Sequence, residues 1–217
     1  MYEKYTGKKI PDLASGAQLY HCHLELEYQL LKKLKQVDGE KVLNELELPL
    51  VPVLLAMERA GVFVDREELK KQSSELESEI FRLEKEIISL AGEPFNVPSP
   101  KQLAGILFDK LKLPVIKKTK TGYSTDNEVL QKLCSSHPIA QNIIDYREMA
   151  KLKSTYVDAL PQLIDRQTGK IHTYFRQAAT STGRLSSVNP NLQNIPIRTA
   201  LGRKVRKAFL ADAGHLL

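Results

Sequence analysis

Residues 66–90 read REELKKQSSELESEIFRLEKEIISL, and this stretch decides the fold. Its apolar residues recur at spacings of seven, four, three, four and three, and most other positions hold Lys, Glu, Ser or Gln. This repeat predicts a helix with one narrow apolar seam, capped by Asp65 and ended by Gly92. At 1.5 Å per residue it reaches roughly 37 Å, which is typical of an arm that projects from a body. The seam consists of Leu69, Leu76, Ile80, Leu83, Ile87 and Leu90.

Further helices are expected before and after this arm. Apolar residues at helical spacing predict helices over residues 24–34, 42–60 and 138–160, the second with Pro49 and Pro52 in its middle. The third is long enough to pack antiparallel against the arm. An elongated helical hairpin is therefore expected.

Short helices and a basic loop are expected at the tip of this hairpin. The run Ser99-Pro100-Lys101-Gln102 combines a serine cap, a first-turn proline and a glutamine three residues after the cap, so it predicts a helix to about Leu111. Thr125-Asp126-Asn127-Glu128 predicts a second helix start by the same capping pattern. Residues 116–125 between them form a loop that is basic, rich in hydroxyls and hinged on glycine.

The pattern changes from helical to extended after residue 165. Residues 167–170 predict a turn, and residues 171–176 alternate as a strand does. Val62–Val64 predicts another short extended segment. The sequence thus predicts a mainly α fold, an elongated antiparallel helical arm followed by a short β-containing part.

The composition is that of a soluble globular protein, with 42% apolar and 27% charged residues. No apolar run approaches the roughly 20 residues of a bilayer-spanning helix, and the N-terminus lacks the layout of a secretory signal. A cytoplasmic protein without a membrane partner is expected. Cys22 and Cys134 are expected to be reduced. The run His21-Cys22-His23 places its side chains on different sides of a helix, so no metal site is expected.

Charge is divided unevenly along the chain. Residues 1–100 hold 13 Lys and Arg against 18 Asp and Glu, whereas residues 101–217 hold 19 against 8. Concentrated basic side chains gain affinity for nucleic acid by releasing condensed counterions. The second half therefore indicates either a phosphate-binding surface or a solvated basic face.

Residues 180–198 are the most informative polar stretch. They hold hydroxyls, carboxamides and two arginines with few apolar residues. Asn, Gln and Arg hydrogen-bond to base edges and sugars, and hydroxyls and Arg bind phosphate, so the stretch favours a duplex-contacting surface. A polar loop satisfied by its own backbone is the alternative.

Four motifs, in the same order as in the family, resemble family A DNA polymerases, the DNA polymerase I-like enzymes. Residues 182–196, from Thr182-Gly183-Arg184 to Asn194-Ile195-Pro196, are similar to the signature at the junction of thumb and palm. Residues 151–156 are similar to the late thumb helix, 118–125 to the thumb-tip loop and 202–209 to the first palm segment. The resemblance implies binding to double-stranded primer-template DNA.

Roles for individual residues follow from the resemblance. Arg184 is expected to contact the primer terminus and the minor groove, whose acceptors are shared by every base pair. Lys151 is expected to hold a phosphate. Near the growing end, the template and primer are expected to be lined by Asn191, Gln193, Asn194 and Arg198. Farther upstream, the backbone is expected to be tracked by Asn96, Lys120, Ser124 and Thr125. Pro98 and Pro100 depart from the family pattern, because they cannot donate backbone hydrogen bonds.

The resemblance also divides the chain. Residues 1–43 are expected to be the tail of a degenerate 3′-5′ exonuclease-like domain, residues 44–165 the thumb, and residues 166–217 the start of the palm, within an α+β fold in the parent. In the exonuclease-like tail, residues 13–20 offer no carboxylate for a metal. The first catalytic aspartate is expected beyond residue 217, with Asp212 in a turn.

This chain is therefore expected to bind duplex without catalysing nucleotide transfer. No catalytic or metal-binding residue and no cofactor are expected in it. Mg²⁺ and dNTP are expected for the complete enzyme only, and the chain is expected to be a monomer. Two alternatives compete: a helical hairpin that binds protein partners through Leu76, Ile80, Leu83 and Ile87, and an RNA-binding module. The second lacks an aromatic stacking platform.

Overall fold

A computed structural model describes residues 2–10, 14–119, 122–197, 199–212 and 214–215. The chain divides into two compact units. One comprises residues 1–59 with 177–184, and the other comprises residues 60–176 with 185–217. The expected division at residues 43 and 165 follows the domains of a longer polymerase and stays a prediction.

The first unit is mostly helical. Helix α1 (Tyr2–Thr6) precedes α2 (Gly16–Gln36), and α3 (Glu40–Val42) runs through a π-helical turn, η1 (Leu43–Glu47), into α4 (Leu48–Ala60). Ser15 begins α2 with a capping box, in which Ser15 accepts from the Gln18 N–H and Gln18 accepts from the Ser15 N–H. The helix expected over residues 42–60 is confirmed and contains Pro52.

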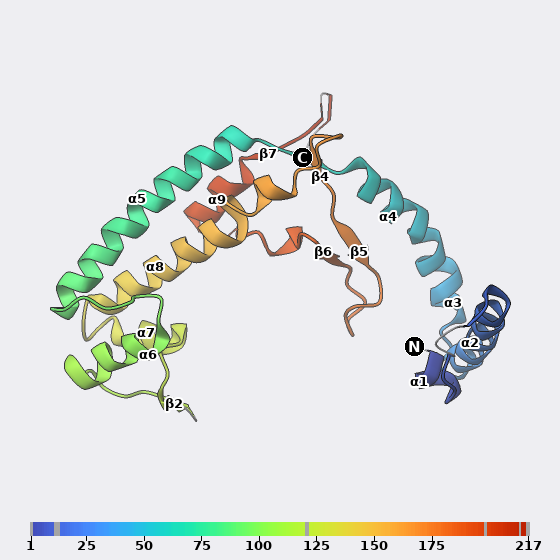
Figure 1. Ribbon diagram of the computed structural model, residues 1–217, viewed down its shortest axis with the longest axis horizontal. Helices are drawn as coiled ribbons and strands as arrows, with labels where there is room; N and C mark the ends of the chain where they lie inside the picture. Colours follow the sequence, from blue (N-terminus) through green and yellow to red (C-terminus); the bar gives the residue numbers. More distant parts are fainter. Residues whose placement is uncertain (1, 11–13, 120–121, 198, 213, 216–217) are drawn as a thin grey trace. The chain divides into compact units, whose positions relative to one another are not determined.

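The second unit contains the expected arm. Strand β1 (Val62–Val64) leads into α5 (Arg66–Ala91), and α8 (Ile139–Leu152) packs along α5 and continues as the π-helical η3 (Lys153–Val157) (Figure 1). Asp65 caps α5 by accepting from the Glu67 and Glu68 N–H groups. Gly92 ends it in the left-handed conformation at φ 71°, which glycine adopts without a Cβ penalty. The hairpin is confirmed with its start and stop signals.

The seam of α5 is internal to this unit. Leu76, Leu83 and Ile87 are all buried, and Ile80 packs against the same core residues. Burial of such side chains stabilises the arm by roughly 1.5–3 kcal/mol each. Because these side chains are packed inside the unit, the seam presents no surface to a partner protein. The protein-binding alternative rested on this seam and therefore loses its support.

Short elements lie at the tip of the arm. They are α6 (Pro100–Ala104), the π-helical η2 (Gly105–Lys110), β2 (Lys118–Thr119), β3 (Gly122–Tyr123) and α7 (Asn127–Leu133). The β2–β3 pair is antiparallel, with Lys118 opposite Tyr123. We call residues 117–125 the tip hairpin; Lys120 and Thr121 in it lie outside the described residues.

Both expected helix starts at the tip exist, but their caps differ in detail. Ser99 caps α6, as expected, by accepting from the Gln102 N–H. The Gln102 side chain instead accepts from the Asn96 N–H at 2.7 Å, which fixes the chain before the helix. The cap of α7 is Asp126 rather than Thr125, because the Asp126 carboxylate accepts from the Val129 N–H at 3.0 Å.

The arm leads through η4 (Leu160–Leu163) to small sheets. Strands β4 (Lys170–Ile171), β1 and β7 (Phe209–Leu210) form one antiparallel sheet in the order β4-β1-β7. Strands β5 (Tyr174–Arg176) and β6 (Ser186–Val188) form another. The single strand expected over residues 171–176 is therefore wrong. It breaks because the buried Thr173 side chain bonds to the Val188 and Pro190 carbonyls, at 3.0 and 2.8 Å.

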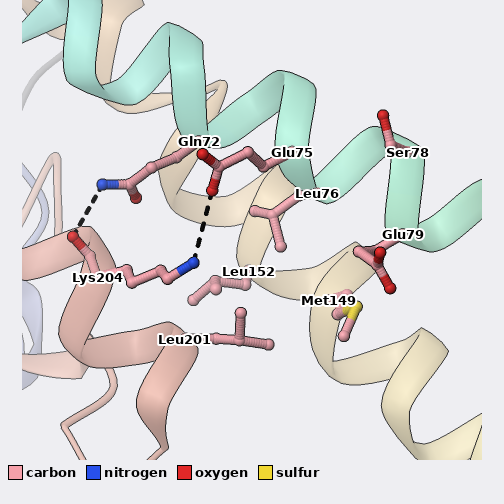
Figure 2. Close-up of a pocket in the computed structure, with 9 residues that line it drawn as sticks. All are labelled: Gln72, Glu75, Leu76, Ser78, Glu79, Met149, Leu152, Leu201 and Lys204. Carbon is pink, nitrogen blue, oxygen red and sulfur yellow. Dashed lines mark hydrogen bonds and ion pairs between the residues drawn. The ribbon is translucent and has the colours of Figure 1, made fainter.

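Two polar contacts join α9 (Ala200–Arg206) to the arm, as Figure 2 shows. The buried Gln72 amide donates to the Lys204 carbonyl at 2.9 Å, and Lys204 Nζ lies 3.5 Å from a Glu75 carboxylate oxygen. A pocket of about 420 Å³ beside them has an apolar floor that includes Leu76 and Leu152. The start of the β-containing part is thus fixed to the base of the arm.

Apolar side chains of the second unit form two clusters, one at the tip and one at the base of the arm. Leu107, Leu130 and Ile143 are fully buried in the tip cluster, and Leu69 and Ile171 in the base cluster. This architecture confirms the expected mainly α class with few short strands. Within the described part of the chain, no helix is both long and apolar enough to cross a bilayer.

Candidate nucleic-acid interface

The first group of expected contact residues lies in a turn at the base of the arm, residues 187–195, which we call the polar turn. Its centre is the buried Ser187, whose hydroxyl accepts from the Leu192 N–H at 2.9 Å and donates to the Pro190 carbonyl at 3.3 Å. Buried hydroxyls with such partners fix the backbone around them. The Ser187 hydroxyl therefore serves the turn itself.

Gln193 takes part in the same internal network. Its side-chain oxygen accepts from the Ser187 N–H at 3.1 Å, and its side-chain nitrogen donates to the Leu185 carbonyl at 3.2 Å. Both ends of the carboxamide therefore hold the turn closed. The expected contact of Gln193 with DNA would have to compete with these two bonds.

Asn191 and Asn194 have exposed side chains on this fixed backbone. Asn191 caps the short helix η5 (Leu192–Asn194) by accepting from the Gln193 N–H at 3.1 Å. The Tyr156 hydroxyl, which comes from η3 of the arm, donates to the Asn194 carbonyl at 2.5 Å. The turn thus offers two carboxamides to solvent from a backbone that is tied to the arm.

Arg184 belongs to the first unit and is exposed. Its backbone forms a closed loop with Thr180, whose hydroxyl accepts from the Arg184 N–H at 3.0 Å and donates to the Arg184 carbonyl at 2.8 Å. The neighbouring Gly183 has φ 70°, which favours glycine. The loop therefore holds the backbone of Arg184 while its guanidinium faces solvent. Arg198 lies outside the described residues.

Lys151 and Asn96 are exposed on the second unit. Lys151 lies near the end of α8, just before the chain continues into η3. Asn96 precedes the Ser99 cap of α6, and its backbone is held by Gln102. Both side chains are accessible to a phosphate.

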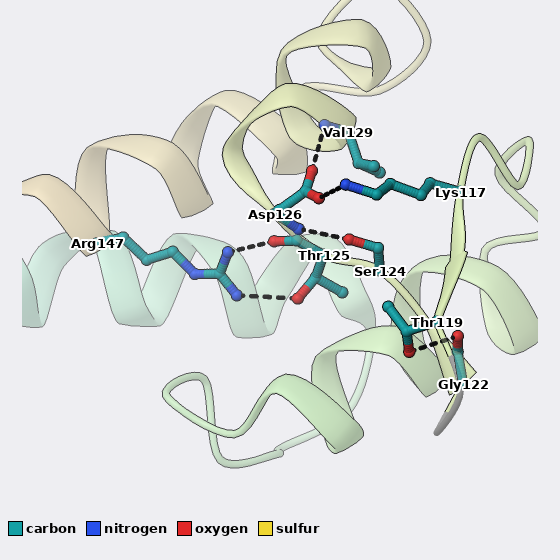
Figure 3. Close-up of polar contacts among 8 residues, drawn as sticks. All are labelled: Lys117, Thr119, Gly122, Ser124, Thr125, Asp126, Val129 and Arg147. Carbon is teal, nitrogen blue, oxygen red and sulfur yellow. Dashed lines mark hydrogen bonds and ion pairs between the residues drawn. The ribbon is translucent and has the colours of Figure 1, made fainter.

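Ser124 and Thr125, expected along the backbone of the duplex, make contacts inside the protein. Both are buried, with 6% and 7% of their surface exposed, at the end of the tip hairpin. Ser124 Oγ accepts from the Asp126 N–H at 3.2 Å, and Arg147 of α8 donates to both the carbonyl and the hydroxyl of Thr125 (Figure 3). These hydroxyls hold the hairpin to the helices, whereas Lys118 beside them is exposed.

An ion pair fixes the other strand of the tip hairpin. Lys117 Nζ lies 2.8 Å from an Asp126 carboxylate oxygen. This ion pair, then the Val129 N–H and the Ser124 hydroxyl, lowers the pKa of Asp126 to about 2. The same carboxylate raises the pKa of Lys117. Lys117 is thus engaged within the protein, although it belongs to the basic loop.

Arg147 was not found from the sequence. It is half-buried, and burial lowers its pKa, whereas the Asp126 carboxylate acts in the opposite direction. The available signal was its place four residues after the buried Ile143 and next to the buried Tyr146, at the edge of an apolar helix face. A charged residue at such an edge usually has a partner.

The described residues contain no group of three or more His, Cys, Asp or Glu side chains that could hold a metal ion. Asp212, expected in a turn, lies 2.9 Å from Lys170 Nζ through its carboxylate.

Comparison with known proteins gives consistent matches. The family model described as DNA polymerase family A matches residues 66–217. DNA polymerase I of Geobacillus stearothermophilus is 51% identical over 97% of this chain and 24% of its own length. The thermostable DNA polymerase I of Thermus aquaticus is 53% identical over 84% of this chain and 23% of its own length.

A solved structure of the POL domain of Pol1 from M. smegmatis, in complex with DNA primer-template and dNTP, is similar as well. It matches 99% of this chain and 38% of its own with a TM-score of 0.90 and 39% identity. The chain spans about a quarter of the length of the curated relatives it matches.

Proposed function

The chain belongs to DNA polymerase family A, and we propose from this premise that it is the part of a template-directed DNA polymerase that grips primer-template duplex during replication and repair. The observation that carries the proposal is the polar turn, where Asn191 and Asn194 are exposed on a backbone fixed by Ser187 and Tyr156. The similar POL domain in complex with DNA primer-template supports it.

The proposed grip has two kinds of contact. Lys151 and the exposed Lys118 bind phosphates, which provides affinity without sequence information. Arg184 approaches the minor groove, where each base pair presents acceptors at similar positions. Asn191 and Asn194 line the template and primer near the growing end. Such contacts accept any correctly paired sequence, as a template-directed enzyme requires.

The remaining expected contacts have narrower roles in this proposal. Gln193, Ser124 and Thr125 hold the polar turn and the tip hairpin in shape. Gln193 reaches DNA only by exchanging an internal bond, and the buried Ser124 and Thr125 reach it only if the hairpin opens. Asn96 contacts the duplex farther upstream. Lys120 stays a proposed contact with the backbone farther upstream, and Arg198 stays a proposed contact with the template and primer near the growing end.

Nucleotide transfer belongs to the complete polymerase in this proposal. Polymerases of this family use divalent metal ions, which stabilise the attacking and leaving oxygens. We propose that the 217-residue chain binds duplex without incorporating nucleotide, and that Mg²⁺ and dNTP bind only to the complete enzyme. A cytoplasmic location and a monomeric state are part of the same proposal, and the elution volume from a sizing column checks the second.

The test measures duplex binding and primer extension with the same preparation. A fluorescent primer-template should bind with an affinity that falls steeply with salt, because bound phosphates release counterions. Arg184→Ala and Lys151→Ala should both weaken binding, whereas Lys35→Ala, which removes an exposed lysine of α2, should not. Undetectable binding at low salt would overturn the duplex grip, and incorporated nucleotide would overturn the division of labour.

A further inference from the structure

We propose that Arg147 is a positioning residue that holds the tip hairpin in the orientation in which it meets a phosphate backbone. The inference rests on the proposed function, because it concerns the grip on the same duplex. It assigns to Arg147 an action through Thr125 rather than on the DNA itself.

The first observation is the geometry of the guanidinium. Its Nη1 donates to the Thr125 carbonyl, and its Nη2 donates to Thr125 Oγ1 at 3.1 Å, so one residue receives both arms of the fork (Figure 3). Two parallel bonds to one residue fix direction as well as distance. The backbone of Thr125, two residues after strand β3, is therefore held to helix α8.

The second observation is burial. Arg147 is half-buried and Thr125 is buried, so water competes poorly for the fork. If Arg147 left Thr125 to bind a phosphate, the Thr125 carbonyl would stay buried without this hydrogen-bond partner, which is unfavourable. The stable use of this arginine is therefore inside the protein.

The third observation is that the other strand has its own tether. Lys117, directly before β2, is paired with Asp126 at 2.8 Å, and the Ser124 N–H donates to the Lys117 carbonyl at 3.0 Å. Each strand is thus fixed at its base to a helix, one to α8 and one to α7. A two-stranded hairpin of this size is not stable alone in water, so its orientation depends on these two tethers.

Loss of the Arg147 tether should therefore affect several groups at once. The exposed Lys118 and Thr119 would still be present but would no longer be held in a fixed orientation. A residue that itself contacts one phosphate lowers the salt slope of binding by about 1 when it is removed. A positioning residue should lower it by more.

The experiment compares Arg147→Lys and Arg147→Ala with Lys151→Ala, a matched control one helical turn along α8. Arg147→Lys keeps the charge but cannot form the fork, which a lysine ammonium does not reproduce. Primer-template affinity is measured over a series of salt concentrations. We expect both Arg147 variants to lower the salt slope by more than about 1 and Lys151→Ala by about 1.

A second measurement needs no DNA. Amide hydrogen exchange at Ser124, whose N–H closes the hairpin, should be at least about tenfold faster in Arg147→Lys than in the unmodified chain, and unchanged in Lys151→Ala. Exchange in the α5 core should be equal in all of them, which shows that each variant is folded. Thr125→Val should add little to Arg147→Ala if both act through the same contact.

The outcomes separate the two proposals. Unchanged amide exchange at Ser124 in both Arg147 variants would overturn the positioning role. The role would also be overturned if the Arg147 variants lowered the salt slope by only about 1 and this loss added fully to the loss caused by Thr125→Val. If the unmodified chain fails to bind duplex at all, the proposed function fails. The exchange result then still decides whether Arg147 holds the hairpin.

Discussion

Replacing Tyr156 with Phe should weaken duplex binding, although Tyr156 touches no predicted DNA contact except through its hydroxyl. The ring is 9% exposed, and its hydroxyl donates to the Asn194 carbonyl at 2.5 Å. Phe keeps the ring and leaves no cavity, so the change removes this one bond. The contribution of such a bond is about 1 kcal/mol, and it stays near that value because the exposed Asn194 can recruit water.

That free energy should appear in binding. If the polar turn must be ordered to present Asn194, the free energy of ordering that the Tyr156 hydroxyl provided must now come from the binding free energy. A loss of about 1 kcal/mol corresponds to roughly fivefold weaker affinity. Titration of a fluorescent primer-template at one fixed salt concentration measures it, and the salt slope should not change because no phosphate contact is removed.

Two further variants complete the design. Tyr174→Phe removes a hydroxyl from a ring that is 58% exposed, so it should bind as the unmodified chain does. Asn194→Ala shows whether the side chain on this turn matters for binding. Full affinity in Tyr156→Phe together with weak binding in Asn194→Ala would refute the reasoning, because the turn would then be ordered without the hydroxyl.

Three other outcomes are expected. Because the pKa of Asp126 is lowered from 3.8 to about 2 in the folded chain, this carboxylate contributes stability that is complete above pH 3.8 and is lost as the pH falls to about 2. Asp126→Asn should therefore flatten that part of an acid-unfolding curve, and an unaltered curve would contradict the prediction. Leu130→Ala should cost about 2–5 kcal/mol in urea unfolding because the side chain is fully buried, whereas equal losses in the half-exposed Leu163→Ala would argue against this packing. Gly92→Ala should cost about 1 kcal/mol or more at φ 71°, and thermal unfolding at an unchanged midpoint would count against it.

The arm could be predicted from sequence because its causes are local. The seam repeats within α5 itself, Asp65 and Gly92 stand at the ends of that helix, and Ser99 stands directly before α6. Each signal acts over a few residues, so a short window contains it. The family motifs then indicated the nucleic-acid partner.

The candidate site could be predicted only in part, because residue type does not reveal which partner a side chain has. Thr125 has the right chemistry for a phosphate, but it is buried and its hydroxyl accepts a hydrogen bond from Arg147, 22 residues later. Gln193 has the right chemistry for a base edge, but its carboxamide closes the turn. The strand over residues 171–176 failed for the same reason, since the acceptors of Thr173 lie beyond residue 187.

The two apolar clusters meet at a narrow, less tightly buried junction in the arm, which we call the waist. Ile80 and Met149 each pack, partly buried, against both clusters, while the fully buried side chains lie on either side of them. Bending at the waist disturbs fewer close-packed contacts than deforming either cluster, so the tip should move as one body. Ile80→Phe should change how freely the arm bends at the waist without unfolding either end. Spin labels on the tip and the base would record this as a changed distribution of the distance between them. The arm thus has two close-packed ends joined by partly buried side chains, an arrangement that favours bending between the ends over bending within either of them.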